Sequence, residues 1–426
     1  MASAASDPGR TRTRQCRLAA ALALVVTTMV GCGNITTVRE GTAQTVSSSV
    51  AAQVDPAQLN TGSYPTTPLP ALGSATTDAA GRLAEGRRMA AAVVGPWQAD
   101  AALIVSGAEP ATVVVTDQDR GRVTWPQIIG IGLYGLPFVV GFVSDRHSAA
   151  PNPQTSLRNA VLRFADPASA SAAVRGMATA SLHMPRIPSA TPMTEPERAI
   201  PVPGHPEAAA TVLTFLDGAD TVREVNAFTA RGPFVLLQVV RAAGGPEKAA
   251  ALVSRTLDLQ LPLIDTFTPT DPAEFGSLPL DPTGLVARTL PSPPDRATAT
   301  TGAAYPRAAA LHFEDNPVQV GPLLSDAGVD FVSINLDTVY QARDAAAAKE
   351  LTTAYGDLVA AAPSAQAAAP VPGLPGSRCV KASQLGGVIS RYWCVVAVDR
   401  YMIKSVARQF DQSQQQLAAQ YRMLTG

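Results

Sequence analysis

The feature that most constrains the fold is a pentapeptide that occurs twice, as Val202-Pro203-Gly204-His205-Pro206 and as Val371-Pro372-Gly373-Leu374-Pro375. Each copy follows a strand-like run and a helix-like run. Each copy precedes three further strand-like runs and a closing helix. This matched order (strand, helix, turn, three strands, helix) predicts two similar modules that arose by duplication. We expect an α+β fold in which helices cover antiparallel β-meanders.

Asp166 and Asp344 each precede an alanine-rich run and are predicted helix N-caps, because a carboxylate there accepts hydrogen bonds from the first turn. Closing helices are predicted from Pro246 onward and over 409–424. The predicted strands are 160–164, 210–215, 222–228 and 234–240 in the first half, and 338–342, 379–384, 392–398 and 401–406 in the second.

Two of the four cysteines, Cys379 and Cys394, fall on the first two strands of the second meander, with a Leu-Gly-Gly turn signal at 385–387 between them. An even pair in an exported protein predicts a structural disulfide. A metal site and a free thiol are the alternatives. The equivalent positions of the first half are expected near Thr211 and Asn226, where there is no cysteine.

The N-terminus has the pattern of an export signal. Residues 1–17 carry four arginines, and 18–30 form an apolar run of thirteen residues, which suits the core of a signal peptide better than a membrane span. Met29-Val30-Gly31-Cys32 resembles the lipobox of bacterial lipoproteins. That resemblance implies a lipoprotein with diacylglyceryl and palmitate groups on Cys32, the first residue of the mature chain. An ordinary secretory signal with a chance cysteine is the alternative.

Composition and charge limit the partners. A formal net charge of −1 provides no basic surface, so no nucleic-acid partner is expected. Apolar residues make up 46% of the chain, which argues against disorder over its whole length. No twin-arginine pair is present, so we expect export by the general secretory route. The predicted location is the outer face of the cell membrane, held there by the lipid on Cys32.

The expected domain organisation places a main boundary in a proline-rich stretch that is either a linker or a segment lying across a domain surface. A helix is expected over 78–94, and a hairpin over 112–116 and 122–125. The predicted segments are a signal peptide (1–31), a flexible tether (32–58), an N-terminal α+β domain (59–267), the proline-rich linker (268–306) and a C-terminal α+β domain (307–426).

Several stretches together resemble a known family. They are the Cys32 lipobox, NTGSYPTTP, RRMAAAVVGPWQAD, LPFVVGFVSDR, NAVLRFADPASASAA, LDPTGLVARTL, DAGVDFVSINLDTVYQARDAAAAKEL and QQQLAAQYRMLTG. The sequence is similar to uncharacterised lipoproteins of mycobacteria and related mycolate-bearing actinobacteria, which carry a domain of unknown function. The resemblance implies a cell-envelope location and brings no catalytic residues. The layout of the C-terminal module also resembles extracellular sensor domains of mycobacterial membrane kinases.

Motifs for chemistry are weak. Gly130 to Gly135 fits G-x-G-x-x-G, but strand-like residues follow it, so we interpret it as a bend and expect no cofactor. Asp117 and Asp119 suggest a calcium loop that lacks its further acids, and a hairpin turn is the preferred interpretation. His312, Glu314 and Asp315 could bind a metal or act in acid–base catalysis. A solvated loop is the preferred interpretation there, with no metal and no catalytic residue assigned.

Trp393 directly precedes Cys394, so the two side chains are expected on opposite faces of a strand. The indole is either packed under the linker or against the first module, or partly exposed at a partner surface. The function predicted is that of a binding or interaction protein for an envelope protein, a lipid or a glycan. The alternative is an envelope hydrolase acting on lipid or glycan, with a site assembled from residues distant in sequence.

Overall fold

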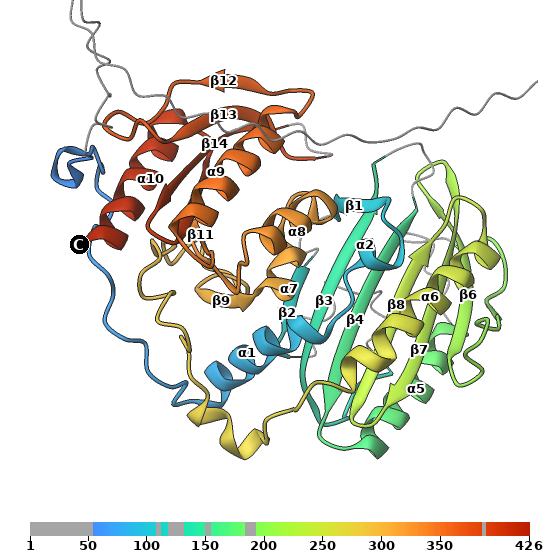
Figure 1. Cartoon of the computed structure of the whole chain (residues 1–426). Coiled ribbons are helices and arrows are strands. Elements are labelled where there is room, and N and C mark those ends of the chain that lie inside the picture. Colours follow the sequence, from blue (N-terminus) through green and yellow to red (C-terminus); the bar gives the residue numbers. More distant parts are fainter. Residues whose placement is uncertain (1–53, 108–111, 118–131, 150–154, 184–192, 386–388) are drawn as a thin grey trace, which may run out of the picture. The chain divides into compact units, whose positions relative to one another are not determined.

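The computed structural model describes residues 54–107, 112–117, 132–149, 155–183, 193–385 and 389–426, and residues 54–426 form one compact unit. Among the described residues, eight strands form a first antiparallel sheet in the order β1-β3-β4-β8-β7-β6-β5, with β2 also paired to β3 (Figure 1). Its strands are β1 Leu103–Ser106, β2 Thr112–Val115, β3 Phe138–Ser148, β4 Ser156–Phe164, β5 Arg198–Ala199, β6 Ala209–Asp217, β7 Asp220–Arg231 and β8 Phe234–Arg241.

The second sheet is antiparallel, and its order in the described part of the chain is β12-β13-β14-β15-β11-β10-β9. It belongs to the C-terminal half. Its strands are β9 Ala303–Pro306, β10 Phe331–Ile334, β11 Thr338–Gln341, β12 Gln366–Ala368, β13 Arg378–Ser383, β14 Ser390–Val398 and β15 Tyr401–Ala407.

Helices flank both sheets. Short 3-10 turns occur at Pro56–Gln58, Ala90–Ala92, Pro272–Ser277 and Leu311–Phe313. Within the described residues, the α-helices are α1 Asp78–Met89, α2 Pro96–Ala99, α5 Pro167–Ser181, α6 Pro246–Ile264, α7 Arg307–Ala310, α8 Pro317–Asp326, α9 Ala345–Ala360 and α10 Phe410–Thr425. We call β1 to β8 with α5 and α6 the N-terminal module, and β9 to β15 with α7 to α10 the C-terminal module.

The two modules share one topology. Read from β5, the first sheet runs β5-β6-β7-β8-β4-β3-β1, and the second runs β12-β13-β14-β15-β11-β10-β9. In both, a helix (α5 or α9) follows the strand in fifth place (β4 or β11) and leads to the first strands of this order, and a second helix (α6 or α10) follows the meander. The predicted α+β fold of two similar modules is therefore confirmed, because the same strand order recurs throughout both sheets.

The repeated pentapeptide is the same turn in both modules. His205 N donates to Val202 O at 3.1 Å, and Leu374 N donates to Val371 O at 2.9 Å. Proline at the second turn position fixes its φ, and the third position requires a positive φ, which only glycine adopts without strain. Gly204 has φ 77° and Gly373 has φ 80°.

The helix starts follow the sequence prediction. Asp166 accepts from Ser169 N at 2.8 Å, and Asp344 accepts from Ala347 N at 2.8 Å, so both aspartates are the N-caps of α5 and α9. The two caps are equivalent positions in the two modules, and so are the two-residue turns that follow Arg231 and Val398. Other residues of the two modules can be matched by counting from these positions.

The two longest helices of each module, α5 and α6 or α9 and α10, pack on opposite faces of its sheet. In the N-terminal module, α6 packs on Val225, Ala227 and Leu236, and α5 packs on the other face of β8, at Val235 and Leu237. In the C-terminal module, α10 packs on the face that carries Cys394 and Ile403, and α9 packs on the face of Val395 and Met402. Each sheet is thus buried on both sides over its central strands.

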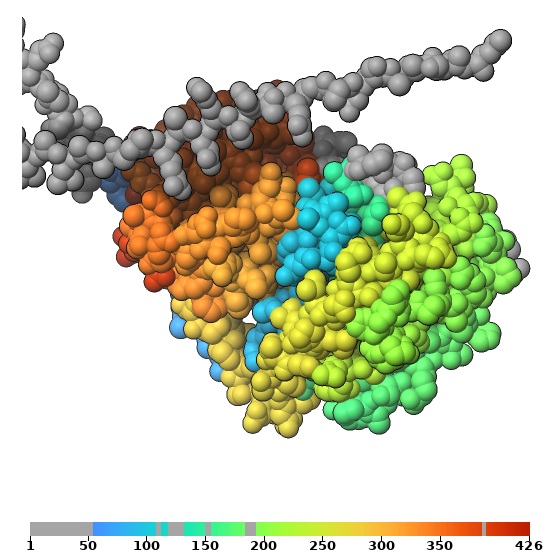
Figure 2. All heavy atoms as spheres, turned by 45° about the vertical axis from the view of Figure 1, so that its right-hand side comes forward, coloured from blue at the N-terminus to red at the C-terminus, as the bar shows by residue number. Residues whose placement is uncertain are grey.

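A glutamine on the closing helix of each module binds an incoming chain segment in the same way. Gln260 of α6 accepts from Val94 N at 2.9 Å and donates to Ala92 O at 2.7 Å. Gln420 of α10 accepts from Leu290 N and donates to Arg288 O at 2.8 Å. The duplicated unit therefore includes a segment before its first strand, which the sequence did not reveal. The outer surface of α6 lies beside the segment that holds α2 (Figure 2), where Arg255 Nε donates to Ala99 O at 3.3 Å.

Some expected elements differ. The α-helix predicted over 78–94 ends at Met89, and a 3-10 turn continues to Ala92. β2 pairs with β3, and the predicted second hairpin strand, 122–125, lies outside the described residues. The last residues of the expected tether are ordered: Pro56–Gln58 form a 3-10 turn, and Val54 packs against the C-terminal core. The predicted linker, 268–306, contains buried Phe275 and Leu290, and strand β9, so it lies across the molecule as a packed segment.

Candidate functional site

The segment 312–315, the one cluster that the sequence suggested for acid–base chemistry, is not a solvated loop. His312 is 2% exposed and Glu314 is 3% exposed. The segment leads from the 3-10 turn at Leu311–Phe313 to α8, and the side chains of His312 and Glu314 bind different modules. The expectation of a solvated loop was wrong because spacing along the chain does not show that both modules pack around this segment.

His312 belongs to the N-terminal module's core. Its Nε2 donates to Val93 O at 3.1 Å, and its Nδ1 accepts from Ser144 at 2.9 Å. Trp97 and Phe142 contact the ring edge-on, each with centroids 5.1 Å away. Burial, reinforced by the charge of Arg146, lowers the pKa of His312 to about 3, so the ring is neutral. Both nitrogens of this buried imidazole are hydrogen-bonded, so neither is available to a substrate or a metal.

Glu314 binds the C-terminal module instead. Its carboxylate accepts from Lys404 Nζ at 3.0 Å, from Tyr355 OH at 2.9 Å and from Tyr340 OH. Lys404 Nζ lies 5.2 Å from the ring centroids of both tyrosines. The buried charges are therefore paired and bonded, which such charges require. Burial first, and then the Glu314 charge, raises the pKa of both tyrosines well above the ordinary value, so both remain donors.

The other copy shows that the fold does not need this polar cluster. Three residues of the cluster, Tyr340, Tyr355 and Lys404, lie on strands or helices of the C-terminal module. Each can be matched with a residue of the N-terminal module by counting from the equivalent N-caps and hairpin turns. All three counterparts are apolar and fully buried. Leu162 corresponds to Tyr340, Met177 to Tyr355 and Leu237 to Lys404.

Arg146 of β3 fixes the backbone of the same segment. Its Nη2 donates to His312 O at 3.0 Å and to Glu314 O at 2.6 Å, and its guanidinium lies 5.2 Å from the Trp97 ring. Burial lowers the pKa of Arg146 to about 10, which still leaves it charged at neutral pH. The segment is thus held by side chains of both modules, which explains why His312, Glu314 and Arg146 are buried without forming an open active site.

A cavity of about 520 Å³ adjoins this cluster, and we call it the apolar cavity. Tyr355 of the cluster and Trp393 of β14 form part of its wall. Asp315 lies at its edge, where it accepts from Leu385 N at 3.0 Å, and burial raises the pKa of this carboxyl. The remaining walls come from the start of α8, the end of α9 and the end of β13; they include Val320, Leu358, Val359, Ala362, Pro363 and Ala382.

Trp393 is 7% exposed and packs with Val359, Ala360 and Ala362 at the end of α9. Its Nε1 donates to Ala382 O at 3.3 Å. The packed alternative from the sequence is therefore correct about burial, but the partner is α9 and neither the linker nor the first module. The sequence placed Trp393 and Cys394 on opposite faces, and they are.

Cys379 and Cys394 are directly opposite each other on β13 and β14 and form the disulfide, with Cα atoms 4.1 Å apart. Counting eight residues from Val202 and Val371 matches Cys379 with Ala210, and the hairpin ends match Cys394 with Ala227. The counterparts are therefore one residue away from Thr211 and Asn226. They are again a cross-strand pair. Within the described ranges, no three His, Cys, Asp or Glu side chains are placed to bind a metal.

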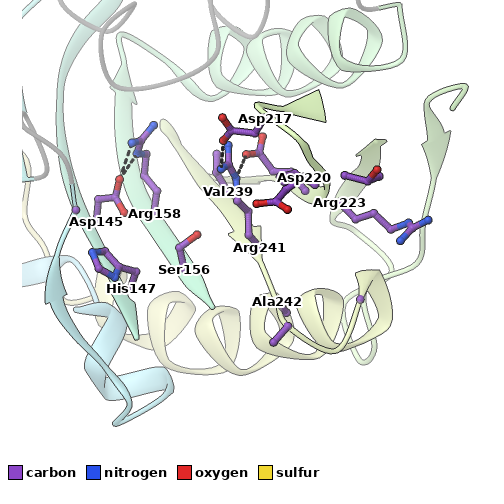
Figure 3. A pocket seen from close by; sticks show the side chains of 16 residues that line it. Asp145, His147, Ser156, Arg158, Asp217, Asp220, Arg223, Val239, Arg241 and Ala242 are labelled. Atoms are coloured by element: carbon purple, nitrogen blue, oxygen red, sulfur yellow. Dashed lines mark hydrogen bonds and ion pairs between the residues drawn. The ribbon is translucent and has the colours of Figure 1, made fainter. Parts of the chain in front are cut away.

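A second cavity, of about 770 Å³, lies on the N-terminal sheet, and we call it the charged cavity. Figure 3 shows Asp145, His147, Ser156 and Arg158 on its adjacent strands β3 and β4. A serine, a histidine and an aspartate in one cavity suggest a hydrolase, but the required chain of bonds is not formed. Asp145 is bound to Arg158, at 2.9 Å to its Nε, and His147 Nδ1 contacts Ser148 O at 2.9 Å.

The other two histidines make contacts with nearby polar groups and form no catalytic arrangement with each other. His205 contacts Glu207 at 3.1 Å and Asp258 at 3.0 Å, and its counterpart is Leu374, which argues against a role shared by both modules. His183 Nδ1 contacts Thr179 O at 2.7 Å. Gly132 follows the part of the glycine-rich motif that lies outside the described residues. It packs against Gly176 of α5, with β3 after it, as the bend interpretation requires.

These features define a protein of two duplicated α+β modules with an apolar cavity in one module and a charged cavity in the other. The chain belongs to the family described as domain of unknown function (DUF7373), whose N-terminal model matches residues 72–280 and whose C-terminal model matches 285–426.

A search of curated proteins found no match. Among solved structures, the extracellular domain of PknH from Mycobacterium tuberculosis is 14% identical, and the match covers 40% of this chain and 93% of that domain, with a TM-score of 0.27. In the part of the chain that the structure describes, no helix is both long and apolar enough to span a bilayer.

Proposed function

We propose that this protein is a lipid-anchored cell-envelope lipoprotein that binds an amphiphilic lipid in the apolar cavity. The observation that carries the proposal is the cavity itself, about 520 Å³, between α8, α9 and β13–β14. Its size falls within the range of small-molecule sites, and such sites are mostly apolar with a few polar groups. The lipobox at Cys32 supports the anchor.

The wall chemistry favours an amphiphile over a uniformly apolar ligand. The side chains of Leu358, Val359 and Trp393 offer apolar surface, and each buried methylene of a ligand would contribute about 0.8 kcal/mol. Asp315 and Gln319 provide polar atoms at the same cavity. A ligand with an acyl chain and a hydrogen-bonding end would satisfy both parts of the wall.

The hydrolase alternative has no support at 312–315, because His312 and Glu314 are buried and bind opposite modules. The binding proposal is tested by titrating the full chain with cis-parinaric acid, a fluorescent fatty acid that accepts excitation energy from tryptophan. We expect saturable binding and energy transfer from Trp393. Substituting Trp393→Phe should remove most of that transfer, whereas Trp97→Phe should not.

A cavity-filling variant provides the matched control. Ala362→Phe places a ring in the wall that packs on the Trp393 cluster, and should weaken probe binding at least tenfold. Ala346→Phe adds the same ring at an exposed site in the first turn of α9 and should bind like the wild type. Equal affinities in the two variants, or no saturable binding by the wild type, would contradict the proposal.

A further inference from the structure

We propose that the charged cavity of the N-terminal module is a binding site for a neutral carbohydrate. The site is separate from the apolar cavity and goes beyond the proposed lipid binding. The argument rests on the ends of β3, β4, β6, β7 and β8, whose side chains surround the cavity in Figure 3.

Most charged groups of this cavity are already paired with one another, and Arg223 donates to Glu195 outside the cavity at 3.0 Å. Asp145 Oδ2 accepts from Arg158 Nε at 2.9 Å and from its Nη2 at 2.5 Å. Arg241 donates to Glu224 at 2.9 Å and to Asp217 at 3.4 Å. The cavity walls carry both signs in nearly equal number: Asp145, Asp217, Asp220 and Glu224 against Arg158, Arg223 and Arg241.

This pairing selects against a charged ligand. A phosphate or carboxylate ligand that bound Arg158 would compete with the Asp145 side chain for it. Asp145 is only 8% exposed, so its carboxylate would be left buried without its partner, which is unfavourable. A free ammonium group would compete in the same way for the carboxylates. A ligand that carries no net charge avoids both costs.

Hydroxyl groups fit the arrangement because each one is a donor and an acceptor at once. A sugar hydroxyl can donate to a carboxylate oxygen of Asp217 or Glu224 and accept from a guanidinium of Arg241 without separating the pair. Bonds to ionised partners are about twice as strong as bonds between neutral groups. Several such bridges along the cavity would recognise a polyhydroxylated ligand.

The groups are held in place before any ligand arrives. The Arg241 guanidinium lies 5.3 Å from the ring centroid of Phe215, and the bonded Glu224 side chain is 6% exposed. Gly107 lies so close to Asp145 that a β-carbon there would be 2.8 Å from the carboxyl carbon. Fixed polar groups reduce the entropy lost on binding.

Other ligand classes fit less well. An apolar chain would remove water from paired charges and return no hydrogen bond. A metal ion is disfavoured because, across the described residues, no three of the ligand-type side chains converge. A nucleic acid would need an excess of basic groups, and acidic and basic groups here are nearly balanced.

The test is an array of immobilised neutral oligosaccharides, with sulfated and sialylated oligosaccharides beside them, probed with the full chain. We expect binding to at least one neutral structure and none that depends on an acidic substituent. Binding to no neutral oligosaccharide, or binding to acidic ones alone, would overturn the inference.

Variants locate the binding. For a neutral oligosaccharide found on the array, Arg158→Ala should weaken binding at least tenfold. Arg231→Ala, which breaks the exposed ion pair with Asp265 outside the cavity, should leave it unchanged. If Arg158→Ala does not fold, Asp217→Asn gives the same readout, because that carboxylate is 63% exposed and its loss should be tolerated. Unchanged affinity in the cavity variant that folds would refute the site.

Discussion

Replacing Asp337 by asparagine should stabilise this protein, and increasingly so as the pH rises. Asp337 lies in the turn between β10 and β11, is 1% exposed, and has two carboxylate oxygens with no hydrogen-bond partner. Burial raises its pKa to about 8, and only the nearby Ser405 acts against the shift. Counted from the N-caps of α5 and α9, its counterpart is Asn159, whose amide donates to Val94 O and to Gln260, each at 2.9 Å.

The free energy follows from the two pKa values of Asp337. The unfolded chain ionises this carboxyl at a pKa of about 3.9, while the folded chain keeps it protonated up to about pH 8. The neutral acid therefore favours the fold fully below about pH 4, and this contribution is lost as the pH rises to about 8. At about 1.4 kcal/mol per unit, the loss at pH 7 is about 4 kcal/mol. An amide at this position does not ionise, and it restores the donor that Asn159 provides in the other copy.

The assay is thermal unfolding of the full chain from pH 5 to pH 9. Asp337→Asn should raise the melting temperature by about 5–10 °C at pH 7. Its advantage over the wild type should grow from pH 5 to pH 8 and then level off. Asp326→Asn, at an exposed aspartate in the last turn of α8, is the control and should show no such trend. A difference between Asp337→Asn and wild type that does not change with pH would refute the reasoning.

Three further outcomes are expected. Cys32→Ala should abolish incorporation of labelled palmitate and block normal signal cleavage; a variant that still ran as the mature, membrane-bound species would show the lipobox interpretation to be wrong. Replacing Cys379 and Cys394 together by alanine should cost about 3 kcal/mol, given a separation of 15 residues, and hydrogen exchange should increase in the C-terminal sheet more than in the N-terminal sheet. The double variant Ala210→Cys/Ala227→Cys should form a second disulfide on oxidation, because these residues are directly paired; free thiol labelling of the oxidised variant would contradict the proposed equivalence of the two modules.

Most helices and strands of the fold could be predicted from local sequence signals. The N-caps at Asp166 and Asp344, the proline-glycine turns and the alternating apolar residues depend on neighbours within a few positions, so the sequence shows them directly. The first predicted meander strand, 210–215, is the centre of β6, and the hairpin that carries the two cysteines forms as expected.

The sites depend on contacts between distant residues, which the sequence does not show. Glu314 is 90 positions from Lys404, and the apolar cavity takes its walls from α8, α9 and β13–β14. A signal could have been found by aligning the two halves residue by residue. Such an alignment places Lys404 opposite Leu237 of the first copy. A lysine on a buried strand indicates that an oppositely charged side chain elsewhere in the chain pairs with it.

The ends of the folded region meet, and this has a mechanical consequence. Leu59 packs into the core beneath α10, and Tyr64 OH accepts from Gln416 Nε2 at 3.0 Å. Leu69 N donates to Ala287 O at 2.8 Å, so this opening stretch lies along the C-terminal module. A load pulling on residue 54 would therefore act first on the contacts that residues 59–64 make with the last helix, α10. The N-terminal module, although earlier in sequence, would carry tension only after those contacts had yielded.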